Sequence, residues 1–168
     1  MPSFRFVFRD MEYGRARETD FYPIAATAVI VLLLGITYCW IARPQGNAAF
    51  LAFLPAFPLD HYPIFISRWF GWLPTFTHVC AFSLLTDLAL GSSHMLFACM
   101  LWGGINALYE LGQALPLEII QLLPDIYNVQ ACFSKGVFDP LDLAACVMGA
   151  SAAWAIFGNR ASQQRESL

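Results

Sequence analysis

The feature that most constrains the fold is a run of twenty residues without a charged side chain, Pro23 to Ala42. A helix of that length rises about 30 Å, which is the thickness of the hydrocarbon core of a bilayer. Arg43 closes the run, and Tyr38 and Trp40 near its end suit the aromatic belt at a membrane interface. The run therefore predicts a transmembrane helix.

The composition of the whole chain agrees with a membrane location. Of 168 residues, 58% are hydrophobic and 12% are charged, whereas soluble domains usually carry about 25% charged residues. The first apolar run follows a charged segment and is long enough to span, so we expect it to be retained rather than cleaved as a signal peptide. The net charge of −3 gives no reason to expect a nucleic-acid partner.

Three further apolar runs, residues 73–91, 94–114 and 140–158, are also long enough to span. The turn after Gly91 is short, so the second and third helices should be antiparallel. We therefore expect an all-α polytopic membrane protein with four transmembrane helices in one domain, residues 23–158. Residues 1–22 are then an interfacial arm, and residues 159–168 are a polar tail.

Residues 44–72 do not fit a single helix. Their apolar part is broken by Pro55 and Pro58, and aromatic residues follow. Because proline interrupts helices, we expect an interfacial or re-entrant excursion between the first and second helices.

Basic residues set the expected orientation. Four spans place both termini and the Gly91 turn on one side, with six arginines. The other side has three basic residues, Arg43, Arg68 and Lys135. The positive-inside rule then puts both termini in the cytoplasm.

The third predicted helix carries a polar stripe, because Asn106, Glu110 and Gln113 follow one another at i, i+4 and i+7 and so share one face. A carboxylate near membrane depth costs a few kcal/mol, so Glu110 should face protein or water. Asp87, one turn from the end of its helix, is expected to reach water.

The predicted topology brings polar residues of three helices to the outer end. His78 begins the second helix, the polar stripe ends the third, and Asp139 and Asp142 begin the fourth. The candidate ligand-binding residues are His78, Glu110, Gln113, Lys135, Asp139 and Asp142.

Each candidate also has a structural explanation. Asp139 before Pro140 is a favourable N-cap, and Asp142 in the first turn is stabilised by the helix dipole. A single histidine on an apolar helix is more often hydrogen-bonded inside the bundle. Glu110 in an ion pair could simply hold two helices together.

At these residues the chain resembles the VanZ-like family of small bacterial membrane proteins. The similar features are a histidine in T-H-V-C-A-F (His78), an E-x-x-Q pair (Glu110, Gln113), an acidic helix start (Asp139, Asp142) and Gly149. Cys146 stands where the family has asparagine, and Gly136 stands where it has a loop arginine, with Lys135 beside it. The resemblance implies a bacterial inner-membrane protein with an outward-facing site. The family is associated with low-level resistance to lipoglycopeptide antibiotics.

Two functions follow as hypotheses. The first is binding of an amphiphile or cell-envelope head group by the outer polar residues, with membrane lipids as partners. The second is a non-catalytic accessory subunit that packs against a larger membrane complex.

An enzyme is less favoured, because the sequence has no nucleophile motif. The histidines are poorly spaced to ligate haem. The cysteines fit buried hydrophobes better than disulfides, so we expect no metal and no cofactor.

Overall fold

The computed structural model describes residues 4–42, 69–90, 94–124 and 129–158, with only the backbone described for residues 4–20, Ala42, Cys132 and Lys135. The helices are α1 (Phe4–Ala42), α3 (Leu73–Leu90), α4 (Met95–Gln113), α5 (Leu117–Ile120), α6 (Val129–Lys135) and α7 (Pro140–Phe157). The described ranges contain no strand. Four helical segments are long and apolar enough to cross a membrane: Phe21–Ile41 in α1, and α3, α4 and α7. The prediction of an all-α polytopic membrane protein is confirmed.

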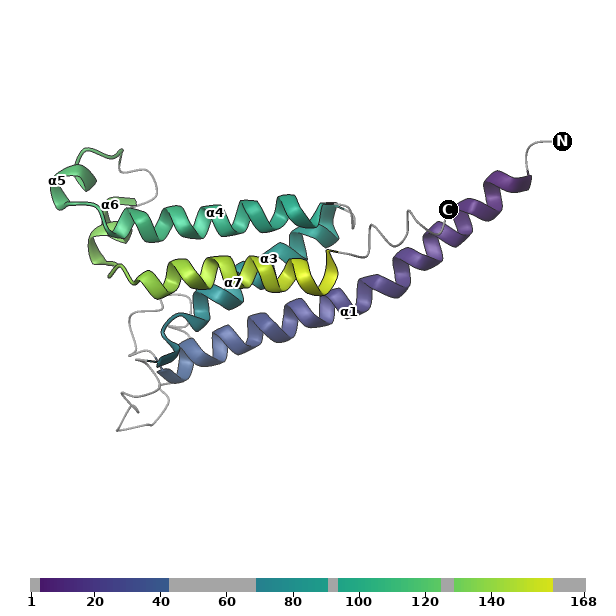
Figure 1. The fold of residues 1–168 in the computed structure, drawn as a ribbon, viewed down its shortest axis with the longest axis horizontal. Coiled ribbons are helices and arrows are strands. Elements are labelled where there is room, and N and C mark those ends of the chain that lie inside the picture. Colours follow the sequence, from purple (N-terminus) through teal and green to yellow (C-terminus); the bar gives the residue numbers. More distant parts are fainter. Residues whose placement is uncertain (1–3, 43–68, 91–93, 125–128, 159–168) are drawn as a thin grey trace.

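Helix α3 lies at the centre of the bundle, because it packs against α1, α4 and α7. Helices α4 and α7 also pack against each other, whereas α1 lies along α3 and continues beyond the bundle (Figure 1). The short helices α5 and α6 lie at the opposite end from the N-terminus.

The predicted boundary between the N-terminal arm and the first span falls inside one continuous helix. Helix α1 runs through Pro23, which removes one backbone donor but has a φ that a helix accepts. The hydroxyl of Thr27 donates a hydrogen bond to the Pro23 carbonyl oxygen at 2.8 Å. The predicted excursion at residues 44–72 lies almost wholly outside the described residues.

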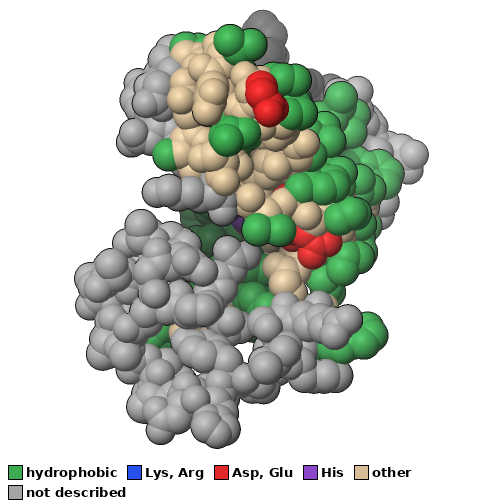
Figure 2. All heavy atoms as spheres, turned by 90° about the vertical axis from the view of Figure 1, so that its left-hand side faces the viewer, with side chains coloured by type: hydrophobic (Ala, Val, Ile, Leu, Met, Phe, Trp, Pro, Cys, Tyr) green, Lys and Arg blue, Asp and Glu red, His purple; other side chains and the backbone are tan. Residues whose placement is uncertain are grey.

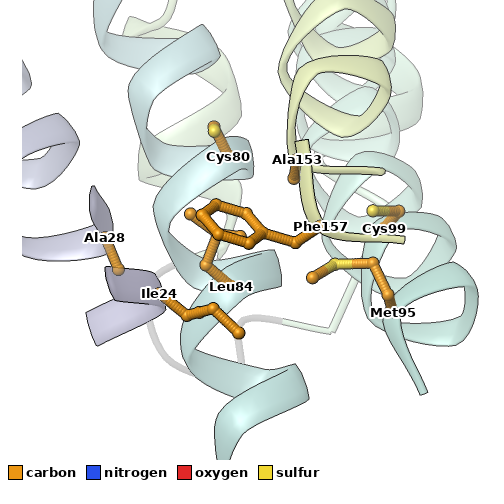
Figure 3. Close-up of a cluster of buried hydrophobic side chains, with 8 residues drawn as sticks. All are labelled: Ile24, Ala28, Cys80, Leu84, Met95, Cys99, Ala153 and Phe157. Atoms are coloured by element: carbon orange, nitrogen blue, oxygen red, sulfur yellow. The ribbon is translucent and has the colours of Figure 1, made fainter. Parts of the chain in front are cut away.

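A buried cluster joins the four spanning helices. It consists of Ile24, Ala28, Cys80, Leu84, Met95, Cys99, Ala153 and Phe157 (Figure 3). Two of these are cysteines, and together with Cys39 and Cys146 they are buried free thiols, as the sequence predicts.

Small residues bring the backbones of α3 and α7 into contact. Ala145, Gly149 and Ala153, spaced by four along α7, are all buried. A methyl group placed on Gly149 would lie 2.6 Å from the carbonyl oxygen of Phe76 on α3. Lipid supplies no hydrophobic force between helices, so close packing of this kind stabilises their association. The four-residue spacing of these small residues in the sequence predicts such a packing seam, and the structure confirms it.

Polar groups also link the helices. Trp102 Nε1 on α4 donates to Thr86 Oγ1 on α3 at 2.7 Å. Cys99 Sγ on α4 donates to the Ala150 carbonyl oxygen on α7 at 3.3 Å. Hydrogen bonds across helices supply about 1 kcal/mol each in membranes.

The expectation that Asp87 reaches water is wrong, because the side chain is 2% exposed. Its Oδ1 accepts a hydrogen bond from the backbone N–H of His94 at 3.1 Å. His94 is the residue before α4, and its N–H is one of the donors that a helix start leaves without an intrahelical acceptor. Asp87 therefore stabilises the start of the next helix.

We expect Gly149→Ala to destabilise the protein by about 1–3 kcal/mol, because the added methyl must push α7 away from the α3 backbone. Thermal unfolding of the purified protein in detergent measures this. Gly104→Ala is the matched control, because a methyl there would meet nothing within 4 Å. Equal losses in the two variants would contradict the α3–α7 contact.

Candidate functional site

The polar stripe of α4 divides into residues with different surroundings. Asn106 Nδ2 donates to the carbonyl oxygen of Trp102 one turn earlier at 2.8 Å, so its side-chain amide is hydrogen-bonded within its own helix. Glu110 is buried, at 7% exposure. Gln113 ends α4, and Gly136 lies directly against its side chain, where even a methyl group would overlap it. Glu110 and Gln113 are therefore the members of the stripe that face other parts of the fold.

Asp139 at the start of α7 acts as a helix cap. It is extended, at φ −124° and ψ 118°, and its Oδ1 accepts a hydrogen bond from Leu141 N at 2.9 Å. Pro140 occupies the first helical position, where its missing N–H costs nothing. The structural explanation predicted for Asp139 is confirmed.

Glu110 and Asp142 converge from two helices. Asp142 lies in the first turn of α7, one turn before Cys146, and Glu110 lies in the last turn of α4. Helices α4 and α7 pack against each other, and Glu110 and Asp142 lie at the same end of this helix pair. One oxygen of each, Glu110 Oε2 and Asp142 Oδ1, is fully buried. We refer to Glu110 and Asp142 as the acidic pair.

His78 has aromatic neighbours. Its ring centroid lies 4.5 Å from that of Phe82 and 5.9 Å from that of Trp102. Trp102 precedes Glu110 by eight residues on α4, a separation of about 12 Å along the helix. The structure thus places the contacts of His78 closer to the middle of the span than the acidic pair. A ligand-binding role for His78 stays a prediction.

Helix α6 covers the end of α4. The ring of Phe133 packs on Tyr109, with centroids 5.7 Å apart, and lies against Gly112, where a methyl group would come within 2.5 Å of its Cζ atom. The side chain of Lys135, the last residue of α6, is outside the described part, so its predicted role is untested. The sequence predicts a loop for residues 115–138, whereas Val129–Lys135 within it forms helix α6.

Helix α5 falls in that same loop. The sequence predicts an amphipathic turn at residues 117–123, and Leu117–Ile120 is helical, with Glu118 exposed and Ile120 buried. Figure 2 looks onto this end of the molecule, where acidic side chains lie at separate places among hydrophobic ones.

A groove of about 500 Å³ runs between α4 and α7 on the outside of the bundle. Its lining is almost entirely apolar and includes several small residues. We call it the α4–α7 groove, and it is lined by Leu96, Cys99, Met100, Gly103, Gly104, Ala107, Leu143, Cys146, Val147, Ala150, Ser151 and Trp154. The sequence predicts close approach of a neighbouring helix at Gly103–Gly104. A Cβ atom added to Gly103 would lie 3.7 Å from the Ala150 Cβ, an ordinary contact, and one added to Gly104 would meet nothing within 4 Å.

The arrangement suits non-covalent recognition. Within the described residues, no group of three or more histidine, cysteine or acidic side chains can hold a metal ion. What the helices do assemble is a pair of carboxylates, a neighbouring amide and an adjacent apolar groove. Carboxylates accept hydrogen bonds and attract cations, and grooves of this kind accommodate hydrocarbon.

Comparison with known proteins adds no assignment: no protein-family model, curated protein or solved structure matches the chain. The fold defines the class as a multi-pass α-helical membrane protein. The resemblance to the VanZ-like family depends on the motif residues alone.

We expect Asp139→Ala to lower the free energy of unfolding by about 1 kcal/mol, because it removes the acceptor for Leu141 N. Asp139→Asn should keep most of the stability, since asparagine also caps helices well. Thermal unfolding of both variants distinguishes the contribution of the capping hydrogen bond from that of the negative charge. If Asp139→Asn loses as much as Asp139→Ala, the negative charge is what matters and the cap assignment fails.

Proposed function

We propose that this protein is a VanZ-like protein of the bacterial inner membrane that binds the head group of an amphiphile or cell-envelope molecule. The observation that carries the proposal is that α4 and α7, which pack against each other, each bring a carboxylate with a buried oxygen to the same end of the membrane span, Glu110 and Asp142. Two carboxylates brought together there need a reason, because acidic groups within spanning helices are costly and usually mark functional sites.

Neighbouring groups can complete such a site. Gln113 ends the helix that carries Glu110 and offers both an amide donor and an acceptor. Asp139, although committed to its cap through one oxygen, has a second oxygen that can accept from a ligand. Lys135 and His78 are proposed from the sequence as anion contacts, with the aromatic contacts of His78 closer to the middle of the span than the acidic pair.

The proposed orientation puts both termini in the cytoplasm and the acidic pair toward the outer face, because the basic residues are concentrated in the terminal segments. A C-terminal fusion to green fluorescent protein should then fluoresce in bacterial cells, and a C-terminal fusion to alkaline phosphatase should be inactive. Active phosphatase with no fluorescence would reverse the orientation.

The binding proposal is tested by purifying the native protein in mild detergent and identifying by mass spectrometry every lipid and protein that accompanies it. We expect one enriched lipid or envelope precursor, and Glu110→Gln should lose it while the protein still folds, because the amide keeps the shape and removes the charge. Leu108→Gln is a matched control: it lies two residues away on the exposed side of α4.

The same purification tests the alternative hypothesis. A stoichiometric set of partner chains, with no enriched small molecule and no effect of Glu110→Gln, would make this protein an accessory subunit. The acidic pair would then serve helix packing only.

A further inference from the structure

The α4–α7 groove leads directly to the acidic pair. On α4, Gly103 and Ala107 line the groove, and Glu110 follows them at i+7 and i+3, on the same face of the helix. On α7, Cys146 lines the groove, and Asp142 precedes it by four residues, on the same face of the helix. The apolar groove and the proposed head-group site are therefore continuous.

The length of the groove fits a hydrocarbon chain. On α4 it extends from Leu96 to Ala107, about 16 Å along the axis. This is about half of the roughly 30 Å hydrocarbon core, the depth that the acyl chains of one leaflet fill. The groove opens on the outside of two membrane-spanning helices, so acyl chains have direct access to it.

Charge defines which head group fits. The two carboxylates lie beyond the end of the groove. Their electrostatic field there is strong, because the surroundings have a low dielectric constant. The described residues at this end of the bundle, 110–124 and 129–142, include four acidic residues and one lysine. Such an end attracts a cation and repels an anion.

We infer that the α4–α7 groove binds an acyl chain of a membrane lipid whose head group carries an ammonium, with the ammonium beside Glu110 and Asp142. The inference rests on the proposed function and adds to it the class of ligand and the position of its chain. The chain accounts for the small residues of the groove, and the ammonium accounts for the acidic pair.

The test uses the full-length protein in vesicles that contain equal amounts of phosphatidylethanolamine and phosphatidylglycerol with identical acyl chains. The protein is extracted in mild detergent, and the lipids that remain bound are counted by native mass spectrometry. The protein should retain phosphatidylethanolamine in preference to phosphatidylglycerol. Asp142→Asn should reduce that preference about tenfold, which corresponds to about 1.4 kcal/mol, because it removes one charge-assisted hydrogen bond.

Two bulky variants test the groove itself. Gly104→Phe places a ring in the groove at a position where a Cβ atom meets nothing within 4 Å, so bound lipid of either kind should fall while the fold is kept. Leu108→Phe adds a ring at a position of α4 that is 69% exposed and lies outside the groove, and it should retain lipid as the unmodified protein does.

The groove inference, the ammonium assignment and the proposed function would each be contradicted by a different result. If Gly104→Phe binds lipid normally but Glu110→Gln loses its ligand, the groove inference is wrong and the proposed function stands. If phosphatidylglycerol is retained as well as phosphatidylethanolamine, the ammonium assignment is wrong. If no lipid is retained and a second copy or another protein occupies the groove, both the inference and the proposed function are overturned.

Discussion

The contact between α3 and α7 at Gly149 determines how the other helices are placed. Without a side chain at this position, α7 can approach the carbonyl oxygen of Phe76 and the backbone of Cys80. Once α7 lies against α3, α4 fits beside both, with Gly103 facing Ala150 and Cys146. In a bilayer, where apolar side chains gain nothing by leaving lipid, such close packing and a few hydrogen bonds stabilise the bundle. The pairing of α4 with α7 then brings Glu110 and Asp142 together.

The same packing explains why a groove remains next to the acidic pair. Gly103 and Gly104 are neighbours in sequence but point to different sides of α4, so one faces α7 and the other leaves open space. Helix α6 covers one end of α4 through Phe133 and Gly112, and the remaining length of the α4–α7 surface stays open. The result is the apolar α4–α7 groove on the side of the protein, with the two carboxylates just beyond one end of it.

Much of this architecture could be predicted from local features of the sequence. The lengths of the apolar runs gave the four spans, and Asp139 followed by Pro140 indicated where α7 begins. The four-residue spacing of Ala145, Gly149 and Ala153 indicated a packing face. Each of these signals depends on residues close together in the chain, and helix geometry converts them directly into positions in space.

Features that depend on contacts between helices could not be predicted from the sequence. Asp87 was expected in water because it lies near a helix end, but its side chain accepts a hydrogen bond from His94 N at the start of α4. His78 was placed at the level of Glu110 from helix lengths alone, and its stacking on Trp102 depends on how α3 and α4 are rotated. The role of Phe133 in covering α4 depends on the fold of a segment without periodicity.

The central claim is that Glu110 and Asp142 form one electrostatic unit. A double-mutant cycle with Glu110→Gln, Asp142→Asn and the double variant measures this directly, through the free energy of unfolding in detergent. The account predicts a coupling of at least about 0.5 kcal/mol, as for groups in contact or in one network. Additive effects, within about 0.3 kcal/mol, would show that the two carboxylates act independently and would contradict a shared site.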